Sequence, residues 1–180
     1  MKVLLTSALL LSISAISFAA DPLVSGPQVG QRPGPYSFLV SSGPERGQLT
    51  CYVCETAEKP GVIVFARTVS GQMAKLMQKI DAQAIAMGGP KCWLTVLGEK
   101  TISQDELGKW TKETGLKSTP TGVFDDPVGP PAYLLAEQAD ITILMFNNKK
   151  VVHNYALKVD QLTEKQLTEI EQKLGTFWKK

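Results

Sequence analysis

Strong net charge, histidine and long hydrophobic runs are all scarce in this sequence. The 19 Lys and Arg residues are nearly balanced by 17 Asp and Glu, and the chain contains 1 histidine. Because no basic stripe with interleaved aromatic residues is present, we expect no nucleic-acid partner. Beyond residues 1–20, no segment is long and apolar enough to cross a membrane, so we expect no membrane span in the rest of the chain.

Residues 1–20 show the pattern of a secretory signal peptide. Lys2 supplies the positive charge, and Val3–Phe18 is an apolar run interrupted only by Thr and Ser. Small residues then lead to a cleavage site after Ala19 or Ala20. The run is too short and too rich in serine for a membrane anchor. The sequence therefore predicts an exported protein, either periplasmic or secreted.

The remainder of the chain divides into a short segment and one domain. Residues 21–35 are rich in proline and glycine and show no periodicity, which is typical of an extended segment. Residues 36–180 have the length of a single domain. With 43% apolar residues in the chain, such a domain can bury a core without disulfides. The 3 cysteines are therefore not needed to hold the fold, and each requires an explanation.

Short apolar runs alternate with amphipathic segments along this domain. Several runs are continuously apolar, which is typical of strands buried on both faces of a sheet. The predicted strands are 36–40, 48–53, 62–65, 93–97, 121–124, 141–146 and 151–155, and the predicted helices begin near Ser70, Ser103, Pro130 and Thr163. Strands that alternate with helices require a mostly parallel sheet, and the terminal hairpin adds antiparallel strands. We therefore predict a three-layer α/β/α sandwich with a mixed sheet, a terminal β-hairpin and a C-terminal helix.

Several segments of this domain resemble the thioredoxin superfamily. The segment Ile141–Val151, I-T-I-L-M-F-N-N-K-K-V, is similar to the thioredoxin hairpin P-T-L-L-L-F-K-N-G-E-V. Val62–Phe65 resembles the strand that leads into the family motif W-C-G-P-C. The strand and helix between Cys92 and Gly115 resemble the insertion of peroxiredoxins (AhpC/TSA) and TlpA-type proteins. The resemblance covers residues 30–175 and implies a thioredoxin-like fold.

The catalytic cysteines of that family do not carry over to this sequence. They fall on the first and last residues of Ser70-Gly71-Gln72-Met73. A serine at a helix N-terminus lacks the acidity of a thiol, and we interpret Ser70 as a helix N-cap. The peroxiredoxin pattern T-x-x-C, started at Thr68, places its thiol on Gly71. The standard site is therefore predicted to be degenerate.

A second departure concerns the cis-proline that the family places before the hairpin strand. That position is Ile141 here. A cis bond before a residue other than proline costs about 2.5–4 kcal/mol, so we expect a trans bond and a differently shaped loop. The standard pocket is thus predicted to be disabled at two separate points.

Cys51-Tyr52-Val53-Cys54 is a C-x-x-C pair that lies before the core strand rather than after it. The spacing permits a dithiol/disulfide couple or half of a metal site. Export favours oxidation. Three interpretations stay open, namely a local structural disulfide, a redox-active couple and a metal site. From strand direction we also hypothesise that Cys92 approaches this pair below the sheet, with an ordinary buried thiol as the alternative.

Other polar residues are weaker candidates. Arg67 follows a core strand and could point toward the degenerate pocket at the carboxyl end of the sheet. Asp125 and Asp126 predict a turn, with help to a metal or substrate site as the alternative. His153 is expected to lie partly exposed in the hairpin and away from any chemistry.

Two functions are compatible with these features. In the first, the chain is an exported thiol–disulfide protein that uses Cys51 and Cys54 on a protein thiol or disulfide partner, without a cofactor. In the second, it is a non-catalytic thioredoxin-like module that binds a protein partner or a metal, and the cysteine pair is structural. The first predicts that Cys51→Ser abolishes disulfide reduction, and the second predicts no turnover.

Overall fold

The computed structural model describes residues 23–89, 91–98 and 100–178. The predicted signal peptide at residues 1–20 lies outside this part of the chain, and the segment 21–35 is described from residue 23 onward. Within the described residues, no helix has the length and apolarity needed to cross a membrane.

One mixed sheet organises the described part of the chain, with strand order β2-β1-β5-β4-β3-β6-β7. The strands are β1 (Phe38–Ser42), β2 (Leu49–Thr50), β3 (Gly61–Ala66), β4 (Lys91–Leu97), β5 (Thr121–Phe124), β6 (Ile141–Asn147) and β7 (Lys150–Leu157). The central strands β3, β4 and β5 run parallel because helices connect them. Antiparallel strands flank them, with β1 and β2 on one side and the β6–β7 hairpin on the other. The predicted mixed sheet and terminal hairpin are confirmed.

The α-helices of the described residues are α1 (Tyr52–Thr56), α2 (Gly71–Ala86), α3 (Gln104–Thr114) and α4 (Glu164–Phe177). Ser70, Ser103 and Thr163 cap the last three, as the sequence predicts. Each side-chain oxygen accepts the backbone N–H of the residue three positions later. In α3 the cap is reciprocal, because the Glu106 carboxylate also accepts the backbone N–H of Ser103.

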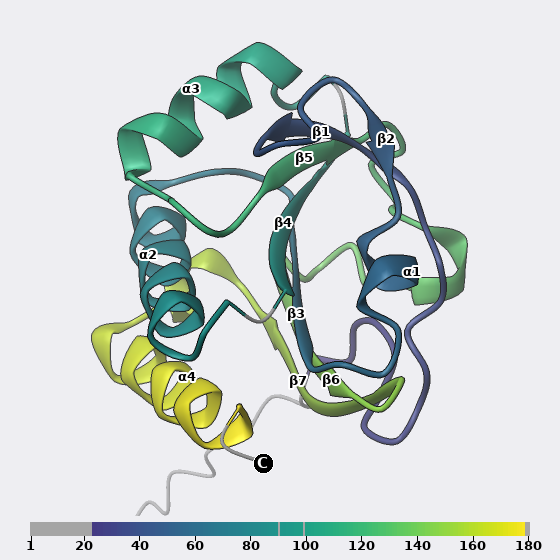
Figure 1. The fold of residues 1–180 in the computed structure, drawn as a ribbon, viewed down its shortest axis with the longest axis vertical. Helices are drawn as coiled ribbons and strands as arrows, with labels where there is room; N and C mark the ends of the chain where they lie inside the picture. Colours follow the sequence, from purple (N-terminus) through teal and green to yellow (C-terminus); the bar gives the residue numbers. More distant parts are fainter. Residues whose placement is uncertain (1–22, 90, 99, 179–180) are drawn as a thin grey trace, which may run out of the picture.

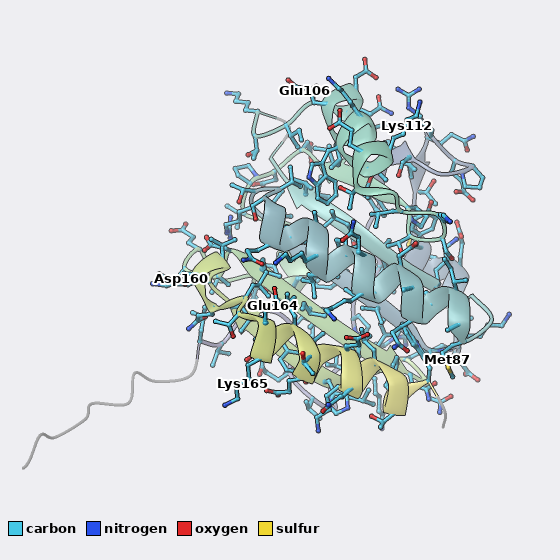
Figure 2. The ribbon with its side chains drawn as sticks, turned by 90° about the vertical axis from the view of Figure 1, so that its left-hand side faces the viewer. Met87, Glu106, Lys112, Asp160, Glu164 and Lys165 are labelled. Carbon is cyan, nitrogen blue, oxygen red and sulfur yellow. A yellow bond between two sulfur atoms is a disulfide. The ribbon has the colours of Figure 1, made fainter. Side chains whose placement is uncertain are left out.

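The helices cover the two faces of the sheet unequally. α2, α3 and α4 lie on one face, to the left of the sheet in Figure 1, whereas α1 and irregular chain cover the other. Figure 2 looks onto the helical side and shows α2 and α4 next to each other, where the ion pairs Lys75–Glu164 and Lys79–Glu171 link them. The predicted three-layer α/β/α arrangement is confirmed, and the layer that contains α1 is the thinner one.

Each face of the sheet buries its own core. The face toward α2 and α4 is mainly aliphatic, and Met73, Leu76 and Ile80 are fully buried there. The opposite face buries an aromatic cluster made of Tyr36, Phe38, Tyr52, Phe65, Trp93, Tyr133 and Phe146. Burial of one large apolar side chain contributes about 1.5–3 kcal/mol. The aromatic cluster therefore attaches α1 to the sheet through Tyr52.

The region predicted as a strand at 48–53 is a strand only at Leu49–Thr50 and becomes helical from Tyr52 onward. β2 contains only 2 residues, and α1 begins directly after Cys51. The aromatic and β-branched residues of this segment favour a strand locally. The tertiary structure overrides that preference, because the helical turn buries Tyr52 against Phe38 and Trp93, with ring centroids 5.4 and 5.7 Å away.

The helix predicted from Pro130 to Ala139 is reduced to a 3₁₀ turn at Pro131–Tyr133. Leu134 ends the turn in a left-handed conformation, with φ at 50°. Two carbonyls later in the segment, those of Ala136 and Ala139, accept hydrogen bonds from the guanidinium of Arg67, and the Ala136 carbonyl also accepts the backbone N–H of Ala139. A distant side chain thus fixes the irregular conformation.

Candidate functional site

Cys51 and Cys54 form a disulfide at the start of α1, with their Cα atoms 5.3 Å apart. Cys51 is the N-cap residue of α1, and its sulfur accepts the backbone N–H of Cys54 at 3.3 Å. Of the interpretations that the sequence left open, the structure contains the disulfide, and both a structural and a redox role fit its geometry. Among the described residues, no group of three or more His, Cys, Asp and Glu side chains is arranged to hold a metal ion.

Tyr52, between the two cysteines, fixes the position of α1. Its ring is fully buried, and its hydroxyl donates a hydrogen bond to Glu45 Oε2 at 2.9 Å. Burial raises the pKa of Tyr52, and the neighbouring Glu45 raises it further, so the phenol stays neutral. The ammonium of Lys91 lies 3.9 Å from the ring centroid and pairs with Glu55 at 3.1 Å. These contacts hold α1 without requiring the sulfur–sulfur bond.

The two sulfur-bearing residues differ in their access to solvent. Cys51 is half-buried, whereas Cys54 is exposed. Cys54 also borders a pocket of about 390 Å³, which we call the Cys54 pocket and which Cys51 does not line. The pocket is lined by Arg32, Pro33, Gly34, Pro35, Val53, Cys54, Ala57, Phe146 and Lys149.

Three segments that are distant in the sequence build the Cys54 pocket. The segment 30–35 is joined to the hairpin, because Gly30 N–H donates to the carbonyl of Val151 at 2.8 Å and Val151 N–H donates to the carbonyl of Gln31 at 2.9 Å. The hairpin turn is joined to the chain after α1 by a bond of 3.0 Å from Asn148 N–H to the carbonyl of Glu58. The pocket walls are thus tied to the sheet by backbone hydrogen bonds.

The charged side chains that line the Cys54 pocket are cationic. Arg32 is exposed and forms no ion pair within the described residues. Lys149 pairs with Glu58 at 3.3 Å. The lining also includes the buried residues Pro33 and Phe146. The pocket therefore combines apolar and cationic side chains beside the exposed Cys54.

Cys92 does not join the other two cysteines, so the hypothesis of a three-cysteine cluster is wrong. It is a free thiol in β4, 1% exposed, and it packs in the core beneath α2 and α4. Side chains alternate along a strand, so Trp93 faces α1 and Cys92 faces the opposite side of the sheet. Burial, together with the charge of Asp81, raises the pKa of Cys92 and keeps the thiol protonated. The alternative of an ordinary buried thiol is confirmed.

The standard thioredoxin site holds structural residues. Ser70 Oγ accepts the backbone N–H of Met73 at 3.3 Å, which confirms Ser70 as the N-cap of α2. Met73 is fully buried in the core. Ile141 follows a trans peptide bond, since no bond in the described residues is cis, and it is paired with Ala66 in the sheet. Both predicted departures from the family are therefore present in the structure: the cysteine positions hold Ser70 and Met73, and the peptide bond before Ile141 is trans.

The side chain of Arg67 holds the loop that precedes β6 through hydrogen bonds. Its guanidinium donates to the carbonyls of Pro127, Ala136 and Ala139 at 2.6, 3.2 and 3.1 Å. Its backbone N–H donates to the carbonyl of Asp140 at 3.0 Å. Arg67 therefore holds the loop that leads to Ile141, and its orientation toward the degenerate pocket stays a prediction.

The remaining weak candidates lie where the sequence predicts. Asp125 and Asp126 form a turn, in which the carboxylate of Asp126 accepts the backbone N–H of Val128 at 2.8 Å. His153 is part of β7 and is partly exposed.

The sequence did not predict the Cys54 pocket. Residues 21–35 are predicted from the sequence as an extended segment, and in the structure part of this segment forms a wall of the pocket. The signal that could have found it is Pro33-Gly34-Pro35, since proline fixes φ and favours an extended, preformed segment. Nothing local to this tripeptide indicates that α1 lies beside it.

Comparisons with known proteins find similar folds and no matching family. No protein-family model and no curated protein matches the chain. Similar solved structures include a candidate protein disulfide isomerase from Bacteroides thetaiotaomicron, with 13% identity, 88% of this chain and 95% of that chain covered, and a TM-score of 0.67. They also include a candidate thiol:disulfide interchange protein DsbE from Chlorobium tepidum, with 14% identity, coverages of 84% and 99%, and a TM-score of 0.60.

A third similar structure is a secreted thiol-disulfide isomerase from Corynebacterium glutamicum, with 13% identity, 81% of this chain and 86% of that chain covered, and a TM-score of 0.56. Identities this low establish the fold and not the activity. The chain therefore has a thioredoxin-like fold, as its sequence resemblance implies.

Proposed function

We propose that this chain is an exported thiol–disulfide exchange protein whose working couple is Cys51–Cys54. The observation that carries the proposal is a disulfide at the start of α1 whose exposed member, Cys54, borders a pocket, in a thioredoxin-like fold whose standard site has no cysteine. The reaction requires no cofactor, because the disulfide itself accepts the two electrons of a partner dithiol.

The energetics of the disulfide support a redox role over a purely structural one. Cys51 and Cys54 are separated by 3 positions, and closing so short a loop stabilises a protein by about 2 kcal/mol at most in the chain-entropy estimate. Tyr52 and the ion pair of Lys91 with Glu55 already hold α1 in place. The fold therefore gains little from the disulfide and can tolerate its reduction.

Export rests on the signal-peptide pattern of residues 1–20, and we place residues 36–180 in the thioredoxin-like domain. An oxidising compartment outside the cytoplasm is where a pair such as Cys51–Cys54 persists as a disulfide. One of the similar structures is named as a secreted thiol-disulfide isomerase, which agrees with this localisation. We expect the physiological partner to be a protein with reactive thiols.

Exchange requires that the pair changes its oxidation state while the protein stays folded. We would equilibrate the chain without residues 1–20 in glutathione buffers of graded potential, and count free thiols by alkylation and mass spectrometry. Single-turnover oxidation of a dithiol peptide would measure transfer. We expect reversible reduction of the pair and complete loss of transfer in Cys51→Ser.

Cys92→Ala is the matched control, because Cys92 is buried on the opposite face of the sheet. We expect this variant to transfer at the wild-type rate. A pair that stays oxidised in excess glutathione, or transfer that persists in Cys51→Ser, would contradict the proposal and favour the non-catalytic binding module.

A further inference from the structure

We propose that Cys54, rather than Cys51, forms the mixed disulfide with the partner, and that the partner presents a cysteine in an acidic peptide segment that binds the Cys54 pocket. This inference rests on the proposed exchange function and deepens it. It assigns a direction to the reaction and a chemical class to the substrate.

Access favours attack on the sulfur of Cys54. The rate of thiol–disulfide exchange depends on which sulfur a thiolate can reach. Cys54 is exposed and borders the pocket, whereas Cys51 is half-buried and does not. A thiolate held in the pocket therefore meets Cys54 first.

The leaving group favours the same direction. Attack on Cys54 releases Cys51 as a thiolate, and the sulfur of Cys51 already accepts the backbone N–H of Cys54 at 3.3 Å. A hydrogen bond to the charged form stabilises it, and a stabilised thiolate leaves faster. In the described structure no hydrogen bond reaches the sulfur of Cys54. Attack on Cys51 would therefore release an unassisted thiolate.

The complete exchange is balanced within the two proteins. The partner thiolate attacks the Cys54 sulfur, a bond forms between these two sulfurs, and the Cys51–Cys54 bond breaks with its electron pair on Cys51. A second thiolate of the partner then attacks the partner sulfur in the mixed disulfide and releases Cys54 as a thiolate. The partner is oxidised to a disulfide, and its two protons end on Cys51 and Cys54.

The lining of the pocket defines the chemistry of the partner. Arg32 has no carboxylate partner among the described residues, and together with Lys149 it supplies the charged side chains of the lining. Opposite charges on a partner increase the rate of association and orient it. Pro33, Val53 and Phe146 make part of the lining apolar, which matches an aliphatic side chain next to the attacking cysteine. At about 390 Å³, the pocket lies within the range of about 300–1,000 Å³ that is usual for ligand sites.

Regiochemistry is the first test. The oxidised chain would be mixed with an excess of a peptide that contains one cysteine between leucine and aspartate, and the reaction would be stopped early with acid. Free thiols would then be alkylated and the products sequenced by tandem mass spectrometry. We expect the peptide on Cys54 and the alkyl group on Cys51, in about a tenfold excess over the reverse product, from access and leaving-group stabilisation together. An excess of the reverse product overturns the assignment.

Charge preference is the second test. The same peptide with lysine in place of aspartate would be compared at low ionic strength, and Arg32→Glu would be compared with Lys112→Glu, which makes the same charge change on the exposed surface of α3. We expect the wild type and Lys112→Glu to react about tenfold faster with the acidic peptide, and Arg32→Glu to lose that preference. A preference that survives Arg32→Glu overturns the role of Arg32.

Glutathione is the third arm, because it is a small acidic thiol without an apolar side chain. A faster reaction with glutathione than with the acidic peptide assigns the pocket to a small thiol and overturns the peptide partner. If no thiol forms a mixed disulfide on either cysteine, the proposed exchange function fails. Mixed disulfides on Cys51, or equal rates with both peptides, leave exchange intact and refute only this inference.

Discussion

The first turns of α1 and α2 contain the same kind of capping hydrogen bond in different surroundings. At α1 the sulfur of Cys51 accepts the backbone N–H of Cys54 at 3.3 Å, and at α2 the oxygen of Ser70 accepts the backbone N–H of Met73 at 3.3 Å. The thioredoxin family keeps its cysteines at the second of these positions, according to the sequence resemblance. This chain has its C-x-x-C pair at the first.

The surroundings decide what each turn can do. α2 has 16 residues, and the residue three positions after its cap is fully buried in the core. α1 has 5 residues, and the residue three positions after its cap is the exposed Cys54 beside the pocket. The comparison teaches that the cap receives an N–H hydrogen bond in both places, whereas the residue that donates it is exposed at α1 and buried at α2.

The largest effect on α1 should come from removing the buried ring of Tyr52, which attaches this helix to the sheet. Tyr52→Ala leaves a cavity among Phe38 and Trp93 and should lower the free energy of unfolding by about 3–5 kcal/mol. Tyr52→Phe keeps the ring and loses only the hydrogen bond to Glu45, so we expect the free energy of unfolding to fall by about 1 kcal/mol. Urea unfolding of the oxidised variants measures both. Equal losses in the two variants would show that the ring is not the anchor.

Reduction of the disulfide should have a smaller effect than loss of Tyr52. The loop between Cys51 and Cys54 is short, and we expect reduction to lower the free energy of unfolding by about 2 kcal/mol at most. The measurement is urea unfolding of the oxidised and reduced protein, with the double variant Cys51→Ser, Cys54→Ser as a control that cannot reoxidise. A loss as large as that in Tyr52→Ala would mean that the disulfide holds α1, which is the expectation for a structural pair.

The cap of α2 should affect stability and leave chemistry unchanged. Ser70→Ala removes the acceptor for Met73 N–H and should lower the free energy of unfolding by about 1 kcal/mol. Ser70→Gly should lower it by only about 0.3 kcal/mol. Thermal unfolding distinguishes the two variants. Both should exchange thiols at the wild-type rate, because Ser70 contacts neither sulfur of the pair. A loss of exchange in Ser70→Ala at unchanged stability would move the working site back to α2.

Features that depend on neighbouring residues could be predicted from the sequence. Ser70 and Ser103 are recognisable as caps because the residue three positions later supplies the partner. The strand at 62–65 is recognisable because its four residues form a continuous apolar run after Pro60-Gly61, and such a run has few other structures. Such signals are local and survive folding.

Features that depend on distant residues could not be predicted. Tyr52 favours a strand by its own propensity, and only its burial against Trp93 makes a helical turn the better solution. The Cys54 pocket joins residues 32–35 to α1 and to Phe146, a combination that appears only after the sheet has formed. The side of the sheet that Cys92 faces follows from its register next to Val62, which strand direction alone does not give.

The start of α3 sharpens the comparison of the caps, because there a carboxylate takes part in the capping hydrogen bonds. The carboxylate of Glu106 accepts from the hydroxyl of Ser103 at 2.6 Å and from its backbone N–H at 2.9 Å. The hydrogen bond from the Ser103 hydroxyl has the larger effect and the one from its backbone N–H the smaller, and both lower the pKa of Glu106. A lowered pKa in the folded state means a contribution to stability that is present above the ordinary pKa of glutamate and is lost as pH falls through the lowered value.

Amide hydrogen exchange in the first turns of the helices, measured from neutral pH into the acid range below the ordinary pKa of glutamate, tests this smallest effect. We expect acid to weaken protection at the start of α3 in the wild type, and Glu106→Gln to remove the pH-dependent part. Glu137→Gln, an exposed residue with no hydrogen bond to the described chain, is the control. The hydroxyl at α2 and the disulfide sulfur at α1 do not titrate in this range, so protection there should follow global stability. If all three starts respond alike, the acid effect is global unfolding rather than loss of one cap.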